Sequence, residues 1–221
     1  MDFKVARQSM VDCQLATNNV ISEKVLEAMG SIPRELFLPE QKREVAYLDE
    51  DILIGEGRYL LEPMITGRMI QALEPQSSDI ALDVGCGSGY SAAVLSSMVE
   101  TVIALETNEN LRQHATKTWL MLDMCNIADM DVDKITDSST NGPYDIIFVN
   151  GAVQEIPEVL INQLKEDTGR MVCVQRDTAQ INGTAVLVKK MSGGGMSVQP
   201  LFDANIPYLE EFGPTKEHFS F

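Results

Sequence analysis

The sequence feature that most constrains this chain is a short apolar run that leads into three glycines at alternate positions. Residues 79–84 read Asp-Ile-Ala-Leu-Asp-Val, and the glycines follow at positions 85, 87 and 89. A buried run bounded by turn residues is typical of a parallel strand that enters a helix. Glycine allows a tight turn and lets a ligand approach the backbone where a Cβ would intrude. A plain strand-to-helix turn without a ligand fits this stretch alone equally well.

A second acidic strand end favours a ligand. Residues 102–105 read Val-Ile-Ala-Leu and are followed by Glu106, 17 positions after Gly89. An acid at the end of the second strand accepts hydrogen bonds from ribose hydroxyls in nucleotide-binding α/β sheets. A dinucleotide fingerprint would place its third glycine where Tyr90 stands. S-adenosylmethionine carries cationic sulfonium and amino groups and no phosphate, so a turn led by Asp83 suits it better. These residues resemble the cofactor site of Rossmann-like methyltransferases, and a dinucleotide site is the weaker alternative.

The order of patterns along the chain predicts one α/β domain over residues 1–221. Residues 1–50 are expected to form a helical cap over the cofactor end, with helices at 3–16 and 22–30, and residues 51–221 the Rossmann-like core. We expect a loop across the ligand at 53–63, helices at 64–73, 108–122 and after Pro157, and an ordered coil or short helix over 207–221. Strands alternating with helices imply a mostly parallel seven-stranded sheet, covered by helices on both faces and closed by a C-terminal antiparallel hairpin. The predicted strands are 79–84, 102–105, 126–133, 144–150, 169–174, 184–188 and 198–202.

Composition limits the partners. The formal net charge of −16 disfavours nucleic acid, whose phosphates need clustered Lys and Arg. No apolar run is long enough to suggest a membrane span. The four cysteines are far apart in the sequence, which predicts neither a disulfide framework nor a zinc site. We therefore expect a cytoplasmic protein without a metal, as a monomer or a weak dimer.

Most of the chain resembles the protein-L-isoaspartate O-methyltransferase family. The resemblance rests on the stretch Ile-Pro-Arg-Glu-Leu-Phe-Leu-Pro at 32–39 and the helix before it, on Gly-Glu-Gly at 55–57, on the glycine turn, and on Pro-Tyr-Asp-Ile-Ile at 143–147. It implies an enzyme that uses S-adenosylmethionine to methylate the free carboxylate of isoaspartyl residues in damaged proteins. The implied partner is a damaged protein or peptide.

Two segments depart from the family pattern. The family typically reads Gly-x-Gly-Gln-Thr-Ile-Ser-x-Pro in the loop whose Thr-Ile-Ser contacts substrate and cofactor. Here the corresponding residues are Arg58, Tyr59, Leu60 and Leu61, so the serine is lost. Near the adenine the family usually shows Gly-Asp-Gly, whereas this chain has Val-Asp-Lys at 132–134. Two alternatives therefore stay open: the same fold acting on a small-molecule acceptor, or an S-adenosylmethionine-binding protein without turnover.

A carboxylate acceptor is already ionised at neutral pH, so its methylation needs no general base. No residue is accordingly assigned as a certain catalyst. The acceptor loop is 58–61, in which Arg58, or less favourably Arg68 on the next helix, could bind a carboxylate in place of the serine. The predicted cofactor-binding residues are Asp83, Gly85, Cys86, Gly87, Ser88, Gly89, Glu106, Thr107, Asp131, Asp133 and Asn150.

Overall fold

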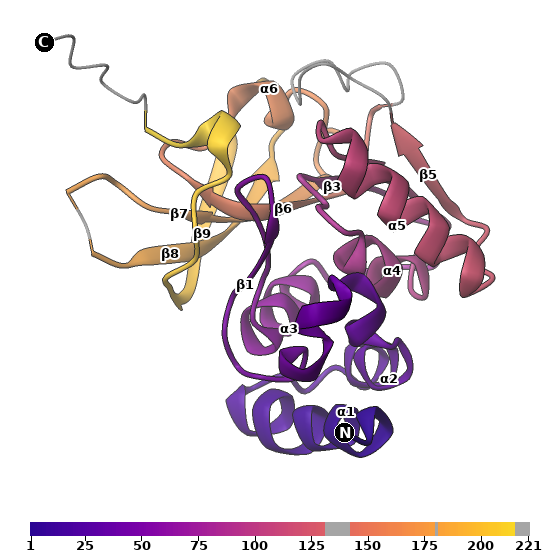
Figure 1. Ribbon diagram of the computed structural model, residues 1–221. Helices are drawn as coiled ribbons and strands as arrows, with labels where there is room; N and C mark the ends of the chain where they lie inside the picture. Colours follow the sequence, from indigo (N-terminus) through magenta and orange to yellow (C-terminus); the bar gives the residue numbers. More distant parts are fainter. Residues whose placement is uncertain (131–141, 180, 215–221) are drawn as a thin grey trace, which may run out of the picture.

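The computed structural model describes residues 1–130, 142–179 and 181–214, and a seven-stranded sheet runs through its centre (Figure 1). The strand order is β5-β4-β3-β6-β7-β8-β9. Strands β3, β4, β5, β6 and β7 are parallel neighbours, and β8 is antiparallel to both β7 and β9. The predicted sheet and closing hairpin are thus confirmed. The strands are β3 (Ile80–Val84), β4 (Thr101–Leu105), β5 (Ile127–Met130), β6 (Ile146–Val153), β7 (Arg170–Gln175), β8 (Gly183–Lys190) and β9 (Met196–Ala204).

The register of the three central strands brings their carboxyl ends together. Val84 of β3 pairs with Leu105 of β4 on one side and with Val149 of β6 on the other. The residues that follow these positions therefore meet at one edge of the sheet. Gly85, Glu106 and Asn150 are those residues.

Alternation along the strands divides the core into two layers. Ala81, Ala104 and Phe148 point to the face covered by α3 (Pro63–Ala72), α4 (Tyr90–Ser96) and α5 (Glu109–Met121). Leu82, Leu105 and Val149 point to the other face, which carries the short helix α6 (Glu158–Ile161). This period of two is the expected pattern for a sheet buried on both faces. Helices lie on both faces as predicted, but most helical turns cover one of them.

The N-terminal segment departs from the predicted boundaries. The expected helix at 3–16 is divided into α1 (Phe3–Met10), a π-helical stretch (Val11–Leu15) and a 3₁₀ turn (Ala16–Asn18) that ends at Asn19 in the left-handed region. Helix α2 (Glu23–Ser31) follows, and Ser22 precedes it without a side-chain capping bond. Two further 3₁₀ turns, Arg34–Phe37 and Glu40–Val45, complete the segment.

Three later boundaries also differ. The expected loop at 53–63 contains a small antiparallel hairpin of β1 (Ile52–Gly55) and β2 (Arg58–Leu60), because Glu56 and Gly57 both adopt positive φ and reverse the chain. Strand β6 does not end at Asn150 but continues to Val153, with an irregularity in its pairing to β7. The third predicted strand is seen as β5, and its residues after Met130 lie outside the described part of the chain. The described part of the tail contains the 3₁₀ turn Glu210–Phe212, and residues 215–221 of the predicted coil or short helix lie outside the described part of the chain.

Only part of the N-terminal segment reaches the glycine turn. In Figure 1, α1 and α2 lie with α3 on the side away from the C-terminal segment. Phe37 makes an edge contact with Tyr90, with ring centroids 5.5 Å apart, and the Arg34 guanidinium lies 4.9 Å from the Tyr90 ring centroid. Tyr90 starts α4 directly after the glycines. In the described residues no helix is long and apolar enough to cross a membrane.

Candidate functional site

The glycine turn after β3 has the backbone that its sequence predicts. Gly85, Gly87 and Gly89 have φ angles of 65°, 57° and 90°, which side-chain-bearing residues rarely adopt. The N–H groups of Gly85 and Cys86 donate to the carbonyl oxygen of Leu105 at 2.8 and 3.1 Å, which ties the turn to the end of β4. Glycine is required here by conformation and also by close neighbours.

Those neighbours come from distant parts of the chain. A Cβ on Gly85 would stand 2.6 Å from Leu209 Cδ1, and one on Gly87 would stand 2.7 Å from Ile54 Cδ1. The Trp119 indole packs against Gly89, and its Nε1 donates to the Gly89 carbonyl oxygen at 2.9 Å. The turn is therefore covered by side chains of the β1–β2 hairpin, of α5 and of the C-terminal segment.

Glu106 lies fully buried beside this turn. Its Oε2 accepts a hydrogen bond from the Gly87 N–H at 2.9 Å, and its Oε1 accepts one from the Asn108 N–H at 2.9 Å. Arg58 Nε donates to both oxygens, at 3.2 Å to Oε1 and 3.0 Å to Oε2. A buried carboxylate needs such partners, because an unpaired charge in the interior is costly.

Arg58 bridges Glu106 to the C-terminal segment. Its Nη2 donates to Thr107 Oγ1 at 3.2 Å and forms a short ion pair with Glu211. Burial opposes the positive charge, but the carboxylates of Glu106 and Glu211 outweigh it and raise the pKa of the Arg58 guanidinium above its usual value. Arg58 is thus a fully charged bridge between β2, the end of β4 and the tail.

Asp83 is the second buried carboxyl group at this edge of the sheet. Its Oδ2 accepts from Ser91 Oγ at 2.7 Å, and its Oδ1 accepts from Asn150 Nδ2 at 2.6 Å. Burial raises the pKa of Asp83 to about 7, although the Ser91 and Asn150 donors lower it and the nearby Glu106 adds to the rise. Asp83 therefore titrates near neutrality and links β3 to α4 and β6.

Two further predicted cofactor residues lie within the turn. Cys86 is buried, and burial together with the charges of Asp83 and Glu106 raises the pKa of its thiol well above the usual value. Ser88 is 2% exposed, and within the described residues its hydroxyl has no hydrogen-bond partner. Such an orphaned hydroxyl beside a glycine turn is suited to a ligand. The predicted residues Asp131 and Asp133 lie outside the described part of the chain.

The acceptor loop is less exposed than its sequence suggests. Leu60 and Leu61 are buried, and Tyr59 is partly exposed. The Leu61 carbonyl oxygen accepts a hydrogen bond from Arg34 Nη2 at 2.6 Å, while Arg34 Nε donates to the Ala46 carbonyl oxygen at 2.7 Å. The fully buried Arg34 therefore fixes the backbone of the loop, and the Leu61 side chain packs into the core.

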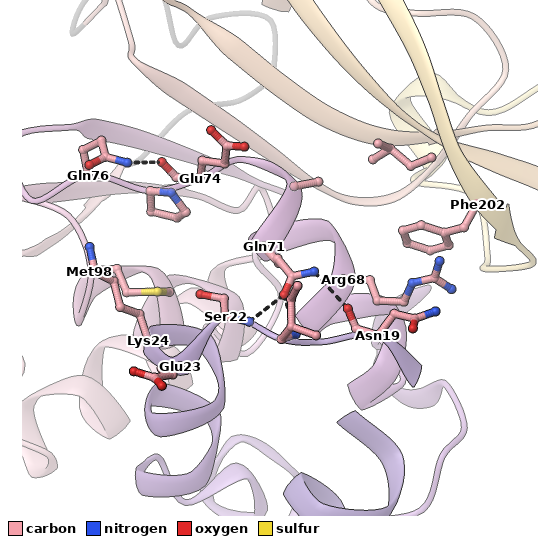
Figure 2. A pocket seen from close by; sticks show the side chains of 14 residues that line it. Asn19, Ser22, Glu23, Lys24, Arg68, Gln71, Glu74, Gln76, Met98 and Phe202 are labelled. Atoms are coloured by element: carbon pink, nitrogen blue, oxygen red, sulfur yellow. Dashed lines mark hydrogen bonds between the residues drawn. The ribbon is translucent and has the colours of Figure 1, made fainter. Parts of the chain in front are cut away.

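Arg68, the second candidate for binding a carboxylate, lies elsewhere. Figure 2 shows it beside Phe202, and its guanidinium carbon stands 3.6 Å from the centroid of that ring. Both residues line an open groove of about 810 Å³ whose wall includes Gln76 and Met98. Gln76 and Met98 precede strands β3 and β4, so the groove lies at the amino ends of these strands, opposite to the glycine turn. The structure does not bring Arg68 to the predicted site.

Sequence reasoning missed three residues of the site: Ile54, Leu209 and Glu211. Ile54 is an apolar residue of the predicted loop, and its contact with Gly87 depends on the hairpin. Leu209 and Glu211 stand in a tail with no motif. The one available signal was the tail's content of apolar and acidic residues after Pro207, which indicates order but does not identify a partner.

The order of the sheet and the glycine turn together identify the class of protein. A seven-stranded sheet of this order, with a G-x-G-x-G turn after its first strand and a buried acid at the end of the next, is that of a Rossmann-like methyltransferase. The sequence profile of the protein-L-isoaspartate(D-aspartate) O-methyltransferase family matches residues 6–205. The chain belongs to that family. Among the described residues no group of His, Cys, Asp and Glu could hold a metal ion.

Individual relatives and solved structures agree with the family match. A Syntrophobacter fumaroxidans protein named protein-L-isoaspartate O-methyltransferase 1 is 37% identical over 172 residues, which cover 78% of this chain and 80% of the relative. A Desulfosudis oleivorans protein-L-isoaspartate O-methyltransferase is 36% identical over 187 residues, covering 85% and 84%. A solved structure named protein-L-isoaspartate O-methyltransferase superposes with a TM-score of 0.79 at 23% identity, covering 94% of this chain and 67% of its own.

A Plasmodium falciparum structure, named as a protein-L-isoaspartate O-methyltransferase in complex with S-adenosyl-L-homocysteine, gives a TM-score of 0.74 at 21% identity. It covers 93% of this chain and 98% of its own. At this identity the two superpositions establish the fold.

Proposed function

We propose that this protein is an S-adenosylmethionine-dependent methyltransferase that transfers a methyl group to the carboxylate of isoaspartyl residues in damaged proteins. The observation that carries the proposal is the family match over residues 6–205, which includes the glycine turn and Glu106. The relatives at 37% and 36% identity have the same name, and the chain covers most of their length.

The residues at the turn fit S-adenosylmethionine. Glu106 offers carboxylate oxygens at the position where a ribose diol would be held. The Ser88 hydroxyl is buried with no partner among the described residues, and Asp83 supplies a second carboxyl group for a cationic ligand. Gly85 and Gly87 carry no Cβ, so a ligand that displaces the neighbouring side chains of Leu209 and Ile54 could approach the backbone closely. When bound, S-adenosylmethionine supplies an electrophilic methyl group on its sulfonium sulfur.

Methylation of a carboxylate requires no general base from the protein. An isoaspartyl carboxylate is ionised at neutral pH and can attack a methyl carbon directly. The protein's part is to hold the acceptor oxygen in line and to exclude water, and orientation of this kind contributes up to about 7–11 kcal/mol. His114 accords with this reading, because its Nε2 lies 3.1 Å from the Leu36 carbonyl oxygen and the ring sits on α5.

The acceptor loop sets the level of activity. Leu61 stands where the resemblance implies a serine, and its side chain is buried. One missing hydrogen bond to a charged acceptor costs about 1.5–3 kcal/mol, or roughly 10- to 150-fold in rate. We therefore expect methylation of isoaspartyl peptides to be slow, with the backbone of the loop and Tyr59 left to hold the acceptor.

The proposal extends to location and partners. We place the protein in the cytoplasm, acting on damaged proteins or peptides as a monomer or weak dimer. Cys13, Cys86, Cys125 and Cys173 are all free thiols, which accords with a reducing compartment.

The test is methyl transfer from labelled S-adenosylmethionine to an isoaspartyl peptide, with the same peptide containing ordinary aspartate as control. The proposal predicts a base-labile methyl ester on the isoaspartyl peptide alone. A Gly87→Val variant should lose the activity, because its side chain would meet Ile54 and strain the turn. Label that enters a small-molecule acceptor but never the peptide would contradict the assignment of substrate, and binding without transfer to any acceptor would contradict the assignment as an enzyme.

A further inference from the structure

Three N–H groups of the protein already occupy the carboxylate of Glu106. Asn108 N–H donates to Oε1, Gly87 N–H donates to Oε2, and the single Arg58 Nε–H is shared between both oxygens. A carboxylate has about four acceptor positions, and a ribose diol would use two of them. A ribose diol could therefore bind Glu106 through both hydroxyls only if one of these donors leaves. The Asn108 and Gly87 donors are backbone groups of the site, so the donor that can leave is the Arg58 side chain.

The same two segments that meet through Arg58 also cover the turn. Ile54, on the hairpin with Arg58, lies against Gly87, and Leu209, in the tail with Glu211, lies against Gly85. The tail is fastened to β6 by backbone hydrogen bonds from Ala152 N–H to the Pro207 carbonyl oxygen at 2.8 Å and from Leu209 N–H to the Ala152 carbonyl oxygen at 2.9 Å. Figure 1 shows the hairpin tip close to the yellow C-terminal turn.

We propose that the β1–β2 hairpin and residues 207–212 form a closure over the cofactor turn, in which Arg58 competes with the cofactor's ribose for Glu106. This inference rests on the proposed function, because it takes the turn to be the S-adenosylmethionine site. Cofactor binding then requires Arg58 to leave Glu106, and the apparent affinity is reduced by the fraction of molecules in the closed state.

The closure couples the cofactor to the acceptor loop. Arg58 is followed directly by Tyr59, Leu60 and Leu61, and the far end of this loop is fixed by Arg34 at the Leu61 carbonyl. Any backbone shift that accompanies the displacement of Arg58 from Glu106 is therefore confined to the stretch before Leu61, which includes Tyr59 and Leu60.

The experiment measures binding of S-adenosylhomocysteine to three variants by calorimetry, with fluorescence of Trp119, the single tryptophan, as a second readout. Arg58→Gln removes the competing charge and is expected to tighten binding about tenfold. Glu211→Gln weakens the bridge while it keeps Arg58, and about a threefold gain is expected. Arg68→Gln makes the same change of charge at the groove opposite the turn and should leave the affinity unchanged.

Unchanged or weaker binding by Arg58→Gln would overturn the closure, since Arg58 would then support the cofactor or play no part. If that variant does not fold, Glu211→Gln decides the matter by the same criterion. The proposed function fails separately: S-adenosylhomocysteine binding that tightens in the variants, with no methyl transfer to isoaspartyl peptide by any of them, would keep the closure and remove the assigned substrate. No binding by any variant would overturn both.

Discussion

Glu106 and Asp83 are two buried carboxyl groups at the same edge of the sheet, and they differ in their hydrogen-bond partners. Glu106 faces the guanidinium of Arg58 at hydrogen-bond distance, so its charge is paired. Asp83 accepts hydrogen bonds from the neutral side chains of Ser91 and Asn150 and from the Ala92 backbone, and burial raises its pKa to about 7. A paired charge and a group that titrates near neutrality are thus placed side by side.

The Asp83 pKa makes stability depend on pH. In the unfolded chain this carboxyl titrates near 3.8, so between about pH 4 and pH 7 the folded state binds the extra proton and stability falls as pH rises. Asp83→Asn removes the effect. We expect the free energy of unfolding of the unmodified protein to fall by roughly 2–3 kcal/mol more than that of the variant between pH 5 and pH 8. Denaturation in urea at both pH values measures it, and parallel curves would contradict it.

Restoring the family's serine and threonine in the acceptor loop tests whether their loss makes methylation of isoaspartyl peptides slow. The double change Leu61→Ser with Tyr59→Thr is expected to raise kcat/KM for an isoaspartyl peptide about tenfold, the lower end for one regained hydrogen bond to a charge. It should also lower the free energy of unfolding by about 2–5 kcal/mol, because Leu61 is buried. Tyr59→Thr alone serves as the control. Full activity of the unmodified protein, or no gain in the double variant, would count against the account.

The sequence predicted the site residues that directly follow strands and missed those that reach the glycine turn from distant parts of the chain. Asp83, Glu106 and Asn150 meet because parallel strands end at one edge, a consequence of topology that a pattern can indicate. The contact of Glu211 with Arg58 joins positions 153 apart, and no local pattern encodes it. Likewise the sequence offered Arg58 as a candidate for binding an acceptor carboxylate and did not indicate that Glu106 and Glu211 of the protein itself pair with it.

Among the structural elements, the C-terminal segment forms one side of the site by pairing with the end of β6. Residues 207–209 bond to Ala152 on the extension of β6 beyond Asn150, and Gln154 N–H donates to the Phe212 carbonyl oxygen at 2.8 Å. The sequence predicted the strand up to Asn150 because the glycine at 151 suggested its end. Gly151 instead permits the tail to approach, since Leu209 lies against the position a Cβ would take.

Gly151→Ala tests that approach. Its Cβ would stand 2.7 Å from the backbone nitrogen of Leu209, so we expect the tail to be displaced and the free energy of unfolding to fall by about 1–3 kcal/mol. Gly195→Ala is the matched control, because the nearest atom to its Cβ is 3.9 Å away. Urea denaturation and limited proteolysis of the tail measure the two effects. Equal stability of the two variants would contradict the packing described.

At the scale of the whole molecule, the fold follows from alternation of strands and helices, and the acidic surface follows from composition. The chain has 33 acidic and 17 basic residues among 221. The mostly parallel sheet and its closing hairpin could be predicted because apolar strand patterns alternate with helical ones along the chain, whereas the order of the strands comes from the structure. The break in the helix expected at 3–16 and the hairpin at 52–60 could not be predicted. Both depend on single residues with left-handed or π-helical backbone, which the spacing of apolar residues does not reveal.

The net charge is −16, so the excess acidic side chains repel one another in the folded state. Added salt should screen this repulsion and stabilise the protein. Raising sodium chloride from about 0.05 M to 0.5 M shortens the Debye length and is expected to add about 1 kcal/mol, roughly 2–4 °C in the unfolding temperature. Sucrose at equal osmolarity controls for the change in solvent. A fall in the unfolding temperature with salt would show that ion pairs outweigh the net repulsion.

Titration calorimetry shows whether the turn at Gly85–Gly89 and Glu106 form an S-adenosylmethionine site. S-adenosylmethionine and S-adenosylhomocysteine are expected to bind with micromolar dissociation constants, on the order of −8 kcal/mol, and NAD is expected to give no heat. Gly87→Val should abolish the binding while its circular dichroism stays that of the folded protein. Heat with NAD and none with either S-adenosyl ligand would show that the turn is a dinucleotide site instead.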